Sequence, residues 1–429
     1  MAIFKSNVLI VDPFSSGAQF AKIIQQDYGF NCLALITNKN LPQFLLSSFR
    51  EKDFFKVFTI HHSINETVTE IENSLGAAPE YILCGSEPGV LVFDILSNRW
   101  NLLPNDIMKS QARRNKYLML KQLQNDGIKH IPFFKSSNIN EILSWAQSQP
   151  FSDYVIKPIL SFGTEDVNFC RSENEIIMAC ENLLEKIDYA GNINHEILIQ
   201  QLIRGDEFVV DVVSSCGYHH VVNIFKYTKQ EINGVPLYQS MISVDVDENP
   251  QLEEYIKSVL DALGVQNGPS HNEVMLTESG PILIECGARM HGGLGPRLVE
   301  ATNSQSLIDL SIMSRINPKK FREIIQSKPY LFKYAAEYFM SSKVDGIINM
   351  NNVKSKCSTI ESYEFDTCEL HVGDHINKTR DLLSSFARIV MTNTSLDKLN
   401  ADLVKICSMD ERNELISIVP RGMKVTLVE

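Results

Sequence analysis

The residues best suited to chemistry are two glutamates that border apolar runs. Glu273 opens the run Glu273–Leu276, Glu285 closes the run Ile282–Glu285, and the turn Thr277–Pro281 joins them. A buried carboxylate is costly unless it is paired or bound to a metal, and neighbouring strands would place these two close together. The pattern favours a bound cation, and carboxylates with room for phosphate oxygens suit Mg²⁺. A surface hairpin with solvated acids is the alternative.

An arginine and a glycine-rich stretch follow the second glutamate. Arg289 precedes His291, Gly292 and Gly293 by only a few residues. A guanidinium and backbone N–H groups can together stabilise an oxyanion that develops during a reaction. The segment therefore predicts a place beside the two glutamates where negative charge accumulates.

Two lysines are candidates for binding phosphate. Lys157 ends the apolar run Tyr154–Lys157, and the small-residue loop Ser161–Thr164, with Gly163 in it, follows. The ammonium group supplies positive charge, and the loop supplies backbone N–H groups that can approach phosphate oxygens. Lys116 begins a predicted helix and is a second candidate cation. Taken alone, each lysine also fits a solvated strand end or an exposed helix residue.

The segment Gln200–Glu207 closes one predicted strand and opens the next. The extended backbone at Gln200 and Leu202 can offer C=O and N–H groups to the edge of an adenine. Glu207 could accept hydrogen bonds from a ribose diol. A plain strand–turn–strand connection with a solvated acid explains the same residues.

The first part of the chain, residues 1–110, alternates strands and helices, which predicts a Rossmann-like parallel sheet covered on both faces. Ligands of such sheets bind at the carboxyl ends of the strands. The turns Asp12–Gly17 and Gly85–Gly89 lie at those ends. We therefore expect Glu87, in the second turn, to pair with the α-ammonium group of a substrate. An exposed loop acid is the alternative.

The remaining elements predict an α/β and α+β chain of several domains. Residues 111–325 would form a second domain, with a mobile lid within 151–226, and residues 326–429 a C-terminal α+β domain. In the middle region, the strands Ile197–Leu202, Phe208–Val213 and Tyr218–Phe225 read as consecutive members of an antiparallel sheet. A helix is predicted over Asn115–Asp126, with Gly127 placed to cap it.

Composition narrows the function classes. The chain has 429 residues, of which 44% are hydrophobic and 21% charged, as in a soluble globular protein. Its net charge of −12 argues against a broad nucleic-acid-binding surface. The nine cysteines are scattered, and no two form a C-x-x-C pair, which argues against a zinc ribbon. Scattered, unpaired thiols fit a reducing cytoplasm. We see no secretory signal or membrane-spanning run, so we expect a cytoplasmic protein.

Together, these pieces resemble the ATP-grasp superfamily. Their order is a lysine at a helix start, a lysine strand with a small-residue loop, a strand followed by G-x-E, and two carboxylate strands with a nearby arginine. The closer likeness is to the bacterial L-amino-acid ligases, which make dipeptides. It covers most of residues 1–320 and is carried by the segments Val8–Pro13, Gly85–Val90, Ala112–Tyr117, Gly268–Glu273 and Ile284–Arg289.

The resemblance implies a role for each candidate residue. The ATP-binding set is Lys116, Lys157, Ser161, Gly163, Gln200, Leu202 and Glu207. The metal ligands are Glu273 and Glu285, with Mg²⁺ expected and Mn²⁺ as the other metal considered. Arg289 would steady the acyl phosphate and the tetrahedral intermediate. The substrate-facing set is Glu87, His271, Gly292 and Gly293.

The activity implied is an ATP-dependent ligase that joins a carboxylate to an amine through an acyl phosphate, releasing ADP and phosphate. Its partners would be ATP and small carboxylates and amines, with no nucleic acid and no membrane, and a homodimer stays open. One alternative is another ATP-grasp enzyme, of the carboxylase or purine-precursor type. A second is an ATP-binding regulatory protein, against which the joint presence of the lysines, glutamates and arginine argues. One departure is Gly287, where many ATP-grasp enzymes carry Asn; the amino-acid-ligase branch also has a small residue there.

Overall fold

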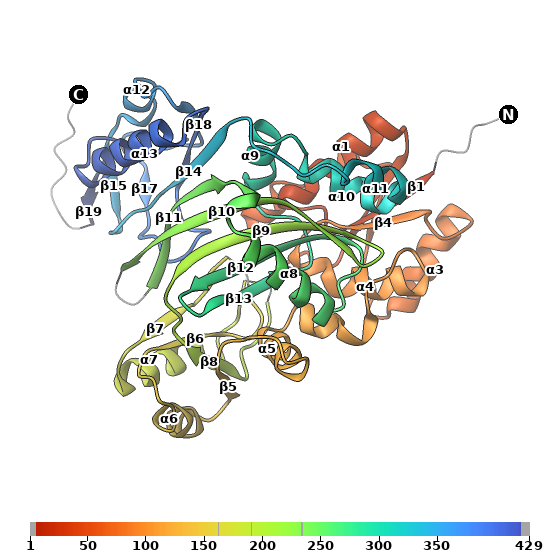
Figure 1. Cartoon of the computed structure of the whole chain (residues 1–429), viewed down its shortest axis with the longest axis horizontal. Coiled ribbons are helices and arrows are strands. Elements are labelled where there is room, and N and C mark those ends of the chain that lie inside the picture. The colour runs from red at the N-terminus through yellow and green to blue at the C-terminus, as the bar shows by residue number, and fades with distance from the viewer. Residues whose placement is uncertain (1–5, 162, 190, 233–234, 422–429) are drawn as a thin grey trace.

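In the computed structural model, which describes residues 6–161, 163–189, 191–232 and 235–421, the chain begins with the predicted parallel sheet. The strand order is β3-β2-β1-β4, and the apolar faces of the strands pack against helices (Figure 1). The strands are β1 (Asn7–Val11), β2 (Asn31–Ile36), β3 (Lys56–Thr59) and β4 (Tyr81–Cys84). The helices are α1 (Phe20–Ile23), α2 (Gln43–Leu46), α3 (Ile64–Leu75) and α4 (Val90–Arg99).

An antiparallel sheet of eight strands forms the middle of the molecule, in the order β13-β12-β9-β10-β11-β14-β18-β16. Its strands are β9 (Asp206–Ser215), β10 (Tyr218–Ile232), β11 (Val235–Val244), β12 (Gly268–Thr277), β13 (Gly280–Gly287), β14 (Tyr334–Met340), β16 (Tyr363–Asp366) and β18 (Ala387–Asn393).

Helices cover both faces of this central sheet. Because side chains alternate along a strand, Val210 packs on the side of α8 and Val209 on the side of α10. The apolar core around Val209 and α10 also includes Val8 and Ile10 of β1, so α10 joins the N-terminal sheet to the central one. The helices here are α8 (Pro250–Ala262), α9 (Gly295–Thr302), α10 (Leu307–Ile316) and α11 (Pro318–Ile324).

A second antiparallel sheet, of four strands in the order β5-β8-β6-β7, lies below the central sheet in Figure 1. We call this unit, residues 133–201, the lid. Its apolar core packs under two helices. Its elements are β5 (Phe133–Ser136), α6 (Ile139–Gln147), β6 (Tyr154–Pro158), β7 (Asn168–Cys170), α7 (Glu173–Leu183) and β8 (Ile197–Gln201).

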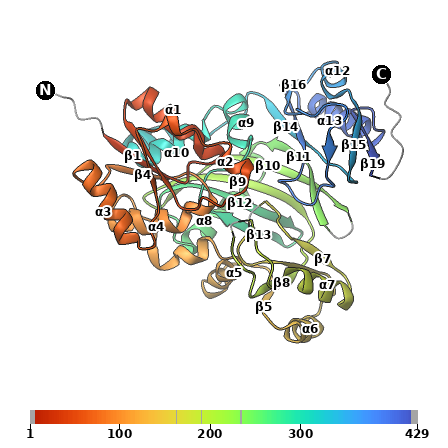
Figure 2. The same ribbon diagram turned by 180° about the vertical axis from the view of Figure 1, so that it is seen from behind.

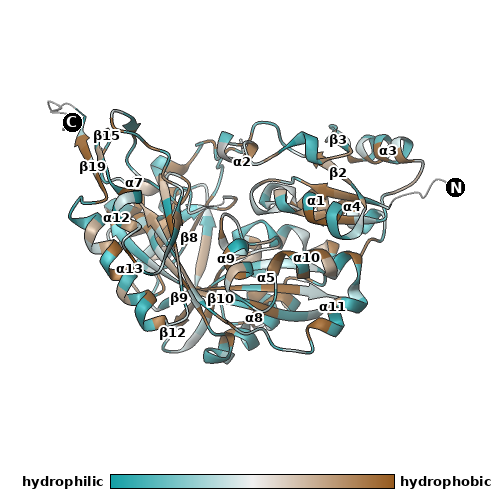
Figure 3. Cartoon of the chain, turned by 90° about the horizontal axis from the view of Figure 1, so that it is seen from above, coloured by the Kyte–Doolittle hydropathy of each residue, from teal (hydrophilic) through white to brown (hydrophobic). Residues whose placement is uncertain are grey.

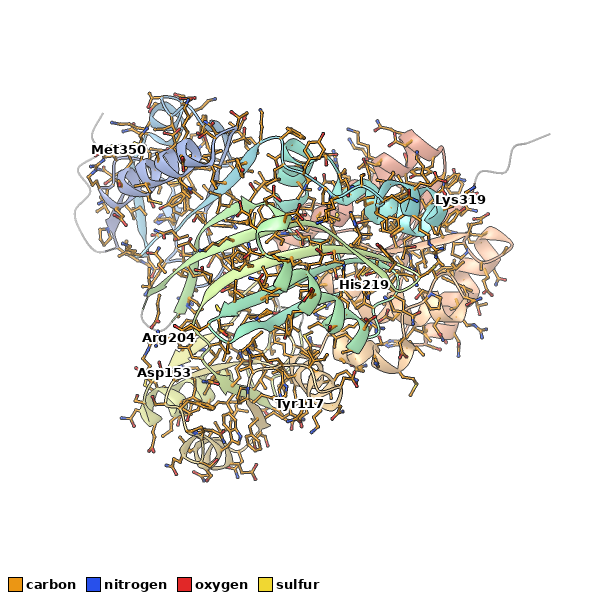
Figure 4. The ribbon with its side chains drawn as sticks, viewed as in Figure 1. Tyr117, Asp153, Arg204, His219, Lys319 and Met350 are labelled. Atoms are coloured by element: carbon orange, nitrogen blue, oxygen red, sulfur yellow. The ribbon has the colours of Figure 1, made fainter. Side chains whose placement is uncertain are left out.

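The sheet of the lid begins before the segment 151–226 that is predicted to contain the lid. β5 belongs to it although it precedes residue 151, and β9 and β10 belong to the central sheet although they fall within 151–226. The chain changes sheets after β8, across a turn that contains Arg204 and Gly205. The Arg204 guanidinium bonds the carboxylate of Asp153 at 2.6 Å, and Figure 4 shows these two labelled side chains together at the lid edge. The prediction that the three consecutive strands β8, β9 and β10 form one antiparallel sheet is therefore wrong for β8, which lies in the lid.

Three strands of the predicted C-terminal domain, β14, β18 and β16, extend the central sheet beyond β11. Figure 2 shows this part beside β10 and β11 from behind, and Figure 3 shows that α12 and α13 carry both hydrophilic and hydrophobic stretches. The apolar side of α13 is buried, as at Leu399 and Ile406. The other elements here are β15 (Gly346–Asn351), α12 (Val353–Cys357), β17 (His375–Ile376), α13 (Leu396–Glu411) and β19 (Ile416–Pro420).

The α/β and α+β fold class is confirmed, as is the capped helix before the lid. That helix is α5 (Lys116–Asn125), and the predicted cap Gly127 follows it with φ 69° and donates its backbone N–H to the carbonyl of Gln124 at 3.2 Å. At the other end, the side chain of Asn115 accepts a hydrogen bond from the backbone N–H of Leu118 at 3.0 Å. Within the described part of the chain, none of the helices has the length and apolarity needed to cross a bilayer.

Candidate active site

The predicted hairpin of β12 and β13 places its two glutamates directly opposite each other. Glu273 and Glu285 are cross-strand partners, and a bulge follows at Glu273/Val274. Side chains of directly opposed residues leave a sheet on the same face. Both glutamates line one cavity, so the hairpin prediction is confirmed.

This cavity has a volume of about 600 Å³ and lies between the lid and the central sheet. It brings together residues from β6, β8, β9, β12, β13 and the start of α5, which are far apart in sequence. The predicted site residues on its wall are Lys116, Lys157, Ser161, Gly163, Gln200, Leu202, Glu207, His271, Glu273, Glu285 and Arg289.

Lys116 connects the phosphate loop to the glutamate pair. Its ammonium lies 3.1 Å from Oε1 of Glu285 and donates to the carbonyl oxygen of Ser161 at 2.9 Å and to its Oγ at 3.2 Å. On the other side of the loop, the backbone N–H of Leu382 approaches Oγ1 of Thr164 at 3.1 Å. Phe162, at the centre of the predicted loop, lies outside the described residues. The loop is thus held between α5 and a C-terminal segment.

Lys157 is buried at the end of β6 and makes no ion pair within 4 Å among the residues described. Burial, followed by the charge of Lys116, lowers the pKa of Lys157 to about 8, although Glu285 and Glu273 oppose this effect. An amine in this state gains a partner when phosphate oxygens enter the cavity. An anionic ligand in the cavity would therefore stabilise the charged form of the Lys157 amine.

The state of Lys157 predicts how ATP use depends on pH. Below its pKa of about 8 the amine is cationic and attracts phosphate, and as the pH rises through that value the charge is lost. We expect kcat/KM for ATP to be level near neutral pH and to fall about tenfold per pH unit well above the pKa. A pH series of initial rates measures this. In Lys157→Arg the guanidinium keeps its charge, so an unchanged alkaline fall in that variant would assign the titration to another group.

Part of the cavity wall is apolar and suits a flat base. This part includes Val155, Phe169, Met275 and Ile284. Oε1 of Gln200 is buried there without a hydrogen-bond partner, which is costly unless a ligand donates to it. The backbone N–H of Leu202, a predicted contact of adenine, donates to the carbonyl of Asp153 at 2.9 Å in this structure.

Glu207 has a partner that the sequence did not indicate. The ammonium of Lys229, on β10, lies 2.6 Å from its Oε1 and 4.3 Å from the ring centroid of Tyr238. Burial raises the pKa of Glu207, and Lys229 opposes this. Lys229 also lines the cavity, as does Lys226, so four lysines of the described residues line it. The signal of Lys229 in sequence is only its alternation with Tyr227 on a long strand, which gives both the same face.

Beyond the glutamates, Asp211 on β9 forms the centre of a buried polar cluster. Its two carboxylate oxygens accept from Nδ1 of His271 at 3.2 Å and Nδ1 of His291 at 3.0 Å, and Asn223 donates at 2.8 Å. The other ring nitrogen of His271 lies 3.7 Å from Oε1 of Glu273. Among the described residues, the ligand atoms of Asp211, His271 and His291 lie close enough together to surround a metal ion. However, the bonds to Asp211 already satisfy one nitrogen of each imidazole.

The predicted substrate-facing residues are only partly together. Among the residues described as lining the cavity, His271 is present but Glu87, Gly292 and Gly293 are not. The backbone N–H of Gly293 donates to Oγ of Ser15 at 3.2 Å, against the N-terminal sheet. Glu87 is buried between Arg114 and Arg289, at 2.6 Å and 2.8 Å from its two carboxylate oxygens. The turn after β4, which carries Glu87, lies against the end of β13. This contact between distant segments cannot be read from the sequence.

Comparisons with known proteins agree with this arrangement. A family model described as the ATP-grasp domain matches residues 150–296. Dapdiamide A synthase of Enterobacter agglomerans is 30% identical over 390 residues, which are 89% of this chain and 90% of that protein. The L-arginine-specific L-amino acid ligase of Bacillus subtilis is 24% identical over 239 residues, 54% of this chain and 57% of that protein.

Solved structures show the same fold. An L-amino acid ligase from Bacillus licheniformis superposes with a TM-score of 0.74 at 15% identity, covering 97% of this chain and 99% of that one. The N5-carboxyaminoimidazole synthetase of Staphylococcus aureus, complexed with ADP, gives a TM-score of 0.66 at 11% identity, covering 94% and 97%. An L-amino acid ligase and an N5-carboxyaminoimidazole synthetase therefore share this architecture.

Proposed function

The chain belongs to the ATP-grasp family of ATP-dependent carboxylate–amine ligases, and from this premise we propose that it activates an amino acid as an acyl phosphate within the cavity described above. The observation that carries the proposal is the directly opposed pair Glu273 and Glu285, flanked by Lys116 and Lys157 and followed by Arg289 on one wall. The carboxylates would hold a metal ion between the phosphates, and the lysines would offset the charge of the phosphates. The arginine would offset the charge that develops on the acyl oxygen.

The nucleotide would lie with its base against the apolar part of the wall and its phosphates toward the lysines. Gln200 would accept from the base, Glu207 would face the ribose, and the loop with Ser161 and Gly163 would cover the phosphates. Glu273 and Glu285 are the donor set that suits Mg²⁺, because hard cations prefer carboxylate oxygens and leave room for phosphate oxygens. When bound, the ion would offset negative charge on the β- and γ-phosphates.

The reaction has two steps. An oxygen of the substrate carboxylate attacks the γ-phosphorus, the bond from that phosphorus to the bridging oxygen breaks, and ADP leaves with the electron pair. A neutral amine then attacks the acyl carbon, a C–N bond forms, and phosphate leaves with the electrons of the C–O bond. The proton that the nitrogen loses goes to the departing phosphate. Arg289 offsets the negative charge on the acyl oxygen, and closure of the lid keeps water from the intermediate.

The substrates proposed are ATP, a carboxylic acid and an amine, with an amino acid on at least one side. Support comes from relatives named as an L-amino acid ligase and as dapdiamide A synthase. The buried cluster of His271 and His291 around Asp211 supplies polar groups beside Arg289, where the acyl end of the substrate would lie.

The products distinguish this route from adenylation. With purified protein, Mg·ATP and a panel of amino acids supplied singly and in pairs, we expect ADP and phosphate to form only with accepted substrates. Added hydroxylamine should capture the activated carboxyl as a hydroxamate in parallel. Phosphate release, hydroxamate colour and mass spectrometry of the amide measure the three products.

A reaction without amino acid controls for simple ATP hydrolysis. Accumulation of AMP and pyrophosphate would refute the acyl-phosphate route. ADP release that no amino acid stimulates would leave ATP use in place and rule out amino acids as the activated acid.

A further inference from the structure

The loop that carries Glu87 is held tightly against the loop after β1. The hydroxyl of Ser86 donates to the carbonyl of Asp12 at 2.8 Å. A Cβ atom on Gly85 would lie 2.5 Å from the same carbonyl oxygen, so only glycine allows this backbone approach. Glu87 is buried at the beginning of a 3₁₀ turn, Glu87–Gly89. Its carboxylate therefore has a defined place in the fold, unlike that of an exposed loop acid.

The guanidinium of Arg289 is engaged on two of its nitrogens. Nε lies 2.8 Å from Oε2 of Glu87 in an ion pair that is not aligned as a hydrogen bond among the described residues, and Nη1 donates to the carbonyl of Met290 at 3.0 Å. Among the described residues Nη2 makes no hydrogen bond, although Arg289 lines the cavity. Two contacts thus determine the orientation of the planar group and leave one nitrogen for a ligand.

Glu87 is itself held from the other side. Nη1 of Arg114 donates to its Oε1 at 2.6 Å, so each carboxylate oxygen faces a different guanidinium. Arg114 is not among the residues that line the cavity. Its side-chain contact with the site, among the described residues, runs through Glu87.

The position two residues before Arg289 has to be small for this arrangement. A Cβ atom on Gly287 would lie 2.9 Å from Oε2 of Glu87 and 3.3 Å from the central carbon of the Arg289 guanidinium. A larger residue would push against the ion pair at the point of contact, because a separation under 3 Å requires something to move. Gly287 therefore leaves room for this ion pair.

We infer that Glu87, held by Arg114, is a positioning residue that orients the Arg289 guanidinium for the acyl-phosphate step. The inference rests on the proposed function and assigns Glu87 a role other than binding the substrate ammonium. A 1 Å displacement of a group that stabilises a transition state can cost a large part of its effect. The rigid loop, the two guanidinium contacts and Gly287 together keep that displacement small.

The charges around Glu87 argue against the ammonium role. Burial by itself would raise the pKa of Glu87, but Arg114 and Arg289 hold it below its usual range, so the carboxylate is anionic and already has two cations. A substrate ammonium would be a third cation competing for the same two oxygens. Such a group would have to displace a buried guanidinium to bind.

The test is Glu87→Gln, which keeps the size of the side chain and removes its charge. In the hydroxylamine assay with an accepted amino acid, we expect kcat to fall about tenfold or more. KM for the amino acid and for ATP should each stay within about threefold, because neither binds Glu87. Glu87→Asp retains the charge at a shorter reach and should recover part of the lost kcat.

Arg114→Gln is the second variant and decides the matter if Glu87→Gln does not fold. It should lower kcat in the same direction but less, since Glu87 keeps its contact with Arg289. The double variant Glu87→Gln/Arg114→Gln should be no slower than Glu87→Gln alone, because both act through one contact. Circular dichroism and ATP binding establish that each protein is folded.

The outcomes separate the inference from the proposed function. Absence of hydroxamate in the wild-type protein would refute the proposed function itself. A wild-type protein that reacts, with a Glu87→Gln variant that keeps kcat and loses amino-acid affinity, would establish ammonium binding and overturn the positioning role. Glu361→Gln is the matched control, since Glu361 forms an exposed ion pair with Lys398 at 2.9 Å and should change nothing.

Discussion

Replacing Glu285 by glutamine is expected to lower turnover by about 100- to 1,000-fold while the protein stays folded. A carboxylate that holds a metal between phosphates contributes several kcal/mol to the transition state, and each 1.4 kcal/mol is about tenfold in rate. The amide keeps the size of the side chain, and its oxygen can still accept from Lys116, which lies 3.1 Å from Oε1. ADP release measured with saturating substrates gives kcat.

The matched control is Glu278→Gln, at the exposed tip of the same hairpin. It removes one negative charge from the same two strands and should leave turnover unchanged. Titrating Mn²⁺ into both variants in the presence of ADP separates loss of metal affinity from loss of fold. Near-normal turnover in Glu285→Gln would contradict the assignment of this glutamate as a metal ligand.

Replacing Arg289 by glutamine is expected to reduce kcat by about 100- to 1,000-fold, as loss of an oxyanion-stabilising donor does elsewhere. KM for ATP should change little, because the proposed nucleotide contacts lie with the lysines and the apolar part of the cavity wall. Glu87 would keep its contact with Arg114, so the local fold has a partner for the remaining carboxylate. Hydroxamate formation and ADP release should fall together.

Arg297→Gln controls for the loss of a positive charge nearby, since Arg297 is exposed on α9 and is expected to contribute nothing to turnover. A variant at Arg289 that loses affinity for ATP but keeps kcat would move the arginine to the nucleotide. A variant that still forms hydroxamate at the normal rate would remove it from the acyl-phosphate step.

The part of the site that sequence reasoning located best depends on local pattern. The hairpin was predicted because two apolar runs flank a turn, and the structure pairs Glu273 with Glu285. Lys116 was placed at a helix start, and Asn115 caps that helix. In both cases a few consecutive residues contain the signal, because strand alternation and helix capping act over one or two turns.

The contacts that sequence reasoning missed join distant segments. Lys229 lies beside Glu207 because β10 pairs with β9 through a long hairpin. Glu87 meets Arg289 because the N-terminal sheet packs against the end of β13. Neither pairing has a periodic signature, and a lysine or glutamate of ordinary spacing reads as a solvated residue until its neighbours are known.

By itself, the sequence determined the alternation of strands and helices at the N-terminus, the glutamate hairpin, and the order of charged residues that predicted ATP-dependent ligation. The tertiary structure decided that β8 belongs to the lid, that β14 continues the central sheet, and that the Glu87 carboxylate lies between two arginines. The physical reason is range: propensity, capping and side-chain alternation act between near neighbours, whereas sheet membership and buried ion pairs depend on which distant surfaces exclude water together.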